Sequence, residues 1–250
     1  MSLYLSKSGV IFLSPGSELK FGARQLMFKK APTLFLISFL FVLLNTILSQ
    51  LIFRLPGTID LAIMYERLAA GEMPSLGLMY SNFRPIGVIL AVVIFLIRPI
   101  LSTGFIGYCM RVRRKQETEY KDIFSGFVIF HKIVLIFLIS SIFIFLWTLL
   151  LLIPGIIASY RYRLAYYILL DDPRKGALQC LNESTVLMKG AKVDLLIIDV
   201  SFLGWHILDL SIILLIQSPF AIPLVAIWLS PYIGITIAGF YEQRITGIAV

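Results

Sequence analysis

Six long apolar stretches, separated by more polar connectors, constrain this chain more than any other feature. A bilayer core about 30 Å thick requires roughly 20 residues of α-helix, so five of the six stretches are long enough to cross it. An α-helix satisfies its own backbone hydrogen bonds, as lipid requires. The sequence therefore predicts an all-α, polytopic transmembrane helical bundle. The stretches cover residues 33–53, 85–110, 133–153, 156–170, 195–216 and 220–240.

The composition leaves no room for a second domain. Hydrophobic residues make up 59% of the chain and charged residues 14%, against about 25% charged in soluble domains. Spans and connectors use nearly all of the 250 residues, so we predict a single integral membrane domain over residues 1–250. A short amphipathic interfacial helix over residues 15–31 precedes the first span, because Pro15 suits a first helical turn and Pro32 separates the two segments.

The basic residues lie almost entirely in connectors on one side of the predicted bundle. If the termini and alternate connectors share a side, the opposite side holds only Arg54, Arg67 and Arg84. This asymmetry follows the positive-inside rule and predicts a multi-pass protein of the cytoplasmic membrane with both termini in the cytoplasm. The net charge of +8 is then a consequence of topology. It favours the anionic lipid leaflet as a partner and does not favour nucleic acid.

The stretch 156–170 leaves two topologies open. Pro154 and Gly155 indicate the turn of a hairpin, which makes this stretch a sixth span. The stretch is short, however, and contains Arg161 and Arg163, each of which costs about 2.5–3.5 kcal/mol at the bilayer centre. As an interfacial helix on the outer side it leaves five spans and an external C-terminus. The basic residues that follow it favour six spans.

Several short motifs run through the second half of the chain. In these residues the chain resembles the domain-of-unknown-function 975 family of bacterial integral membrane proteins. The resemblance implies a polytopic protein of the cytoplasmic membrane and implies no reaction. The motifs are Leu146-Trp147, the string LLLIPGII at 150–157, Ser184, Met188-Lys189-Gly190, Phe202, Trp205, Pro231-Tyr232 and Phe240-Tyr241.

The predicted fifth span carries Asp199, His206 and Asp209. At 100° per helical residue, Asp199 and His206 differ by about 20° and His206 and Asp209 by about 60°, so the three form one stripe. A His between two carboxylates can pass protons or bind a cation, and the same groups can also hydrogen-bond neighbouring helices. Arg98, directly before Pro99 in the second span, is predicted either as the counter-ion of Asp199 or Asp209 or as a substrate-binding charge.

The sequence contains no recognisable catalytic motif. It has no HExxH, no phosphate-binding loop and no GxSxG elbow. With only His131 and His206, no metal site is predicted, and we expect no cofactor. Cys109 and Cys180 lie near the predicted cytoplasmic face, so no disulfide is expected.

These observations predict a non-enzymatic membrane protein that is an accessory or regulatory partner of another membrane system. The partner is then another membrane protein, a second copy of the chain or the anionic lipid leaflet. The alternative is a small transporter or permease that uses Asp199, His206, Asp209 and Arg98. A membrane-embedded lipid enzyme is the third possibility.

Overall fold

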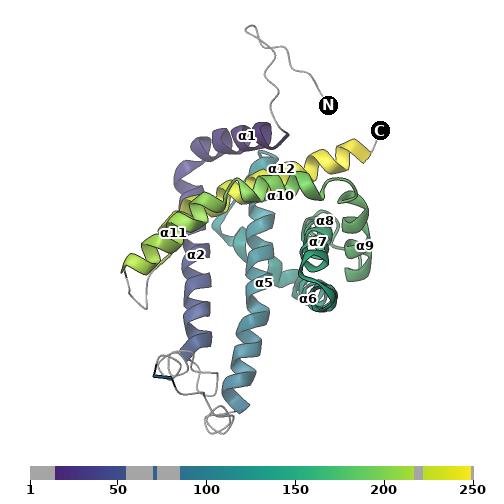
Figure 1. Cartoon of the computed structure of the whole chain (residues 1–250). Helices are drawn as coiled ribbons and strands as arrows, with labels where there is room; N and C mark the ends of the chain where they lie inside the picture. The colour runs from purple at the N-terminus through teal and green to yellow at the C-terminus, as the bar shows by residue number, and fades with distance from the viewer. Residues whose placement is uncertain (1–14, 55–69, 72–84, 217–221, 249–250) are drawn as a thin grey trace.

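The computed structural model describes residues 15–54, 70–71, 85–216 and 222–248, and every regular element in these ranges is a helix (Figure 1). The predicted all-α class is therefore confirmed. The elements are α1 (Pro15–Lys29), α2 (Ala31–Arg54), α5 (Pro85–Arg113), the 3-10 helix η1 (Tyr120–Ile129), α6 (Phe130–Leu150), α7 (Leu152–Tyr162), α8 (Ala165–Asp171), α9 (Ala177–Leu187), α10 (Lys192–Val200), α11 (Leu203–Ile216) and α12 (Leu224–Ile248).

Five helical segments are long and apolar enough to cross a membrane. These segments overlap five of the six predicted spans and support a multi-pass membrane protein; the bounds of the spans stay predictions. The predicted fourth span, 156–170, is instead divided between α7 and α8, with Arg163 and Leu164 between them. Neither helix alone reaches the length of a span. The five segments are Pro32–Ile52, Pro85–Arg113, Tyr120–Leu150, Lys192–Ile216 and Leu224–Gly247.

The last helix, α12, lies at the centre of the packing. Half of its apolar window is buried, against 17–22% in the other four segments. Figure 1 shows α12 running obliquely across the upper parts of α2 and α5, with α1 close to its C-terminal half. Gly234 permits the approach to α5, because a Cβ there would lie 2.5 Å from the Cys109 sulfur. The centre of the fold is thus a helix–helix contact built on small residues, as is common in membrane bundles.

A second close approach joins α5 to η1. A Cβ added to Gly104 would lie 1.9 Å from the carbonyl oxygen of Ile123, and one added to Gly126 would lie 2.3 Å from that of Ile100. Glycine is therefore required on both sides of this crossing. The contact holds η1, the first part of the segment Tyr120–Leu150, against α5.

An ionic cluster joins the C-terminal ends of α5, α8 and α12. Arg114 donates to both carboxylate oxygens of Asp171, at 2.6 and 3.1 Å, and to Glu242 at 3.3 Å. Arg113 also donates to Glu242, at 3.2 Å, and the Tyr241 hydroxyl donates to Asp171 at 2.8 Å. The hydrogen bond to Asp171 raises the pKa of Arg114. Three helix ends that are distant in sequence therefore lie at the same end of the molecule.

The helices α6 and α7 fold back on each other as a hairpin. At its closed end, a Cβ on Gly155 would lie 2.1 Å from the Thr148 hydroxyl oxygen. At its open end, Lys132 near the start of α6 donates to the carbonyl oxygens of Pro173 and Lys175, directly after α8, at 2.5 and 3.2 Å. Together α7 and α8 therefore return the chain to the end from which α6 departs.

Large apolar side chains cover the outer surfaces of the long helices. Leu215 on α11 is 88% exposed and Leu149 on α6 is 74% exposed, and similar side chains line α2 and the first half of α5. Contiguous apolar surface on this scale is characteristic of membrane contact.

Candidate functional site

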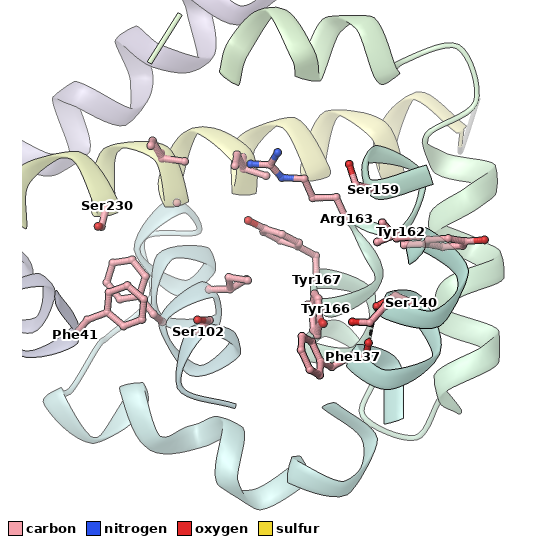
Figure 2. A pocket seen from close by; sticks show the side chains of 17 residues that line it. Phe41, Ser102, Phe137, Ser140, Ser159, Tyr162, Arg163, Tyr166, Tyr167 and Ser230 are labelled. Carbon is pink, nitrogen blue, oxygen red and sulfur yellow. Dashed lines mark hydrogen bonds between the residues drawn. The ribbon is translucent and has the colours of Figure 1, made fainter. Parts of the chain in front are cut away.

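A cavity of about 480 Å³ lies between α2, α5, α6, α7, α8 and α12 (Figure 2). We call it the central cavity. Its walls are mainly apolar, with Phe105, Ile106 and Ile233 among them. The exceptions are one charged side chain, Arg163, and a set of hydroxyl groups. The hydroxyl groups belong to Ser102, Ser140, Ser141, Ser159, Ser230, Tyr162, Tyr166 and Tyr167.

The break between α7 and α8 positions the polar end of the central cavity. Leu164 and Ala165 are fully buried at the break and fix the backbone there. Figure 2 shows Arg163 and Tyr167 reaching into the cavity from this side. Arg163 lies in the break and Tyr167 in the first turn of α8, so the junction of the two helices supplies the one charged side chain among the residues that line the cavity.

Asp199 neutralises Arg163. The guanidinium forms two parallel hydrogen bonds with the carboxylate of Asp199, and the Nη2–Oδ1 distance is 3.1 Å. The Tyr160 hydroxyl donates to the same carboxylate at 2.9 Å. The side chains of Arg163 and Asp199 are 33% and 22% exposed. The ion pair therefore joins the α7–α8 break to the last turn of α10 and leaves the remaining guanidinium N–H groups for the cavity.

The predicted stripe of Asp199, His206 and Asp209 is not assembled. Ser201 and Phe202 form a turn between α10 and α11, and Asp199, which lies before this turn, has Arg163 and Tyr160 as its partners. Asp209 is buried and accepts a hydrogen bond from the backbone N–H of Val225, at 3.0 Å, at the start of α12. His206 is exposed on α11. The three residues therefore have separate surroundings, and two of them stabilise helix contacts.

Arg98 does not form the ion pair with Asp199 or Asp209 that the sequence predicted. The counter-ion of Asp199 is Arg163 rather than Arg98, and the partner of Asp209 is a backbone group. Arg98 instead lines two smaller cavities, of about 390 and 350 Å³, on the α2 and α5 side of the molecule.

Sequence reasoning missed Arg163 as a site residue. The sequence did contain evidence for a role of Arg163, because an arginine within an apolar stretch is costly to insert and requires a partner or a cavity. Among the described residues, no group of three or more His, Cys, Asp or Glu side chains is arranged to hold a metal ion. Cys109 and Cys180 are both buried free thiols.

The long apolar helices, with a cavity between them, define a multi-pass α-helical membrane protein. The chain belongs to the family described as "Protein of unknown function (DUF975)", which it matches over residues 13–154 and 148–247. The match extends the resemblance from the second half of the sequence to nearly the whole chain. No curated protein and no solved structure matches the chain.

Proposed function

We propose that this protein is a non-enzymatic, multi-pass protein of the bacterial cytoplasmic membrane that binds an amphiphilic molecule in its central cavity. The mixed lining of that cavity carries the proposal. Ligand sites of roughly 300–1,000 Å³ with mainly apolar walls and a few convergent polar groups are typical of small-molecule binding. No His, Cys, Asp or Glu is among the residues that line the cavity, which favours binding over catalysis.

The proposed orientation places the ionic cluster in the cytoplasm. Arg113 and Arg114 end α5 within the most basic connector of the chain, and the cluster ties α8 and α12 to it. Basic residues near span ends are retained inside. The N-terminal helix α1 packs on α12 and shares this side. Arg24 and Lys29 of this region, which are exposed, then meet the anionic leaflet.

This orientation predicts a specific labelling pattern for introduced cysteines. Lys115→Cys, after α5, and Arg174→Cys, after α8, are both exposed and should react with a membrane-impermeant maleimide only after the cells are permeabilised. Ala70→Cys should react in intact cells. The native thiols give little background, because both are buried and burial raises the pKa of Cys180. Labelling of Arg174→Cys in intact cells would show that α7 and α8 do not return the chain.

Filling the central cavity should weaken ligand binding without loss of folding. We expect Ser141→Phe, on the α6 wall, to weaken binding of an uncharged amphiphile about tenfold or more, because the added ring occupies the ligand volume. The probe is dansylaminoundecanol, detected by energy transfer from the three tryptophans of the protein in phosphatidylcholine nanodiscs.

The matched control is Ser211→Phe on α11. Ser211 is exposed and its hydroxyl bonds only to its own helix, at 2.8 Å from the Ile207 oxygen. This variant should bind the probe as the wild type does. Absence of saturable binding by the wild-type protein would exclude the proposed function.

A binding protein of this kind serves another membrane system, either by delivering its ligand or by responding to it. A transporter is the second candidate, and the adjoining cavities favour it. The 390 Å³ cavity shares Ser102, Ile106, Phe137 and Tyr166 with the central cavity, which connects the surroundings of Arg98 and Arg163. Ion-coupled flux in proteoliposomes that is abolished by Asp199→Asn would support the transporter over the accessory protein.

A further inference from the structure

We infer that Arg98 binds the anionic headgroup of the amphiphile whose apolar part lies in the central cavity. This inference rests on the proposed function and adds the chemical class of the ligand. The molecule is a single-chain carboxylate or phosphate amphiphile, and Arg98 rather than Arg163 recognises its charge.

Arg98 lies beside two cavities that both border the central cavity, and this position is the first observation in favour of the inference. Both smaller cavities are lined by Arg98 and Asn45. One of them borders the central cavity along α5 and α6, and the other borders it through Phe41 and Ser230. A chain of methylene groups in the central cavity can therefore extend past these shared residues and place its headgroup beside Arg98.

Charge distinguishes the two arginines. Arg163 is already neutralised by Asp199, whereas no carboxylate within the described ranges forms an ion pair with Arg98. Arg98 lies near the middle of the 29-residue helix α5, directly before the helix-internal Pro99. An uncompensated guanidinium at that depth is costly. An anionic ligand group removes the cost, and the planar fork of Arg suits carboxylate and phosphate oxygens.

The polar side chains opposite Arg98 support the same assignment. Asn45, Thr46 and Ser49 on α2 line the 350 Å³ cavity with Arg98. Each of them donates to a carbonyl oxygen one turn earlier in α2, at 2.8–2.9 Å. The hydroxyl donors of Thr46 and Ser49 are therefore occupied, the Asn45 amide keeps one further N–H, and Arg98 provides the charged donors of the site.

The test compares an acid with its alcohol. In phosphatidylcholine nanodiscs, at a pH where the carboxyl group is ionised, wild-type protein should bind dansylaminoundecanoic acid about tenfold or more tightly than dansylaminoundecanol. Arg98→Gln should remove this preference and leave alcohol binding unchanged. Arg98→Lys keeps the charge and should retain part of the preference. Arg98 is exposed in the protein alone, so both variants should fold, as gel filtration would verify.

The outcomes separate the inference from the proposed function. Equal preference in wild type and Arg98→Gln, with alcohol binding still lost in Ser141→Phe, would overturn the role of Arg98 alone. Lack of binding of both probes would overturn the proposed function and the inference with it. Displacement of the acid by millimolar inorganic phosphate would show that Arg98 takes a soluble anion, which also contradicts the headgroup assignment.

Discussion

The Gly104→Ala variant should melt roughly 10 °C below the wild type in detergent, because among the glycines compared in the described residues an added methyl group would come closest to another atom at Gly104. The new Cβ would lie 1.9 Å from the carbonyl oxygen of Ile123 and 2.8 Å from its carbonyl carbon. Both atoms belong to the backbone, so no side chain can rotate away and η1 must move from α5. Overpacking of this kind costs about 1–3 kcal/mol or more. Melting is followed by tryptophan fluorescence and by gel filtration after heating.

Gly107→Ala is the matched control for this prediction. It lies one turn later on α5, and its Cβ would meet the Leu170 side chain at 3.4 Å, an ordinary contact with a group that can adjust. Alanine also raises helix propensity by about 0.5–1 kcal/mol over glycine. We therefore expect Gly107→Ala to melt within a few degrees of the wild type. Equal melting temperatures for the two variants would show that the α5–η1 contact does not limit stability.

The continuous apolar stretches of the sequence correctly predicted the positions of the long helices. The helix predicted over 15–31 is present as α1, and the helix predicted over 85–110 is the greater part of α5; the interfacial position of the first stays a prediction. These predictions succeed because lipid requires helix wherever the chain is continuously apolar. The local sequence alone is nearly sufficient to predict helices of this kind.

The break between α10 and α11 was not predictable in this way. Residues 201–202 contain neither proline nor glycine. The interruption lies where α1 contacts the chain: Lys20 hydrogen-bonds the Ser201 hydroxyl and lies over the Phe202 ring, 4.6 Å from its centroid. Phe202 is buried and packs edge-on against Tyr232 of α12. These contacts join the turn to segments 30 and 181 positions away in the sequence, so local sequence alone does not reveal it.

The same limit applies to the candidate site. The sequence identified its costly charges, Arg98, Asp199 and Asp209, because ionisable residues are rare in apolar stretches. It paired Arg98 with the aspartates, whereas the partner of Asp199 is Arg163, which lies between α7 and α8. Composition thus revealed which residues need partners, and only the fold revealed the partners.

The Asp199→Asn variant is expected to lose about 2 kcal/mol of stability, or roughly 5 °C in melting temperature. Removing one partner of a fully buried ion pair costs about 3–5 kcal/mol, because the other charge is left uncompensated. The Arg163–Asp199 pair is partly exposed, which lowers the figure. Asn retains an acceptor for the Tyr160 hydroxyl but not the negative charge. The measurement is thermal melting in detergent, with Asp194→Asn on the exposed face of α10 as the control expected to cost less than about 1 kcal/mol.

The double variant Arg163→Gln/Asp199→Asn separates a structural ion pair from an ion-binding carboxylate. If the cost of Asp199→Asn is the uncompensated Arg163, removing that charge should restore about half of the lost stability, and the two effects should be non-additive. If Asp199 instead binds a transported ion, the double variant should not recover, because loss of the carboxylate impairs ion-coupled flux whether Arg163 is present or not. Additive destabilisation in the cycle would therefore contradict the ion pair as the reason for Asp199, and would return this residue to the list of candidate transport groups.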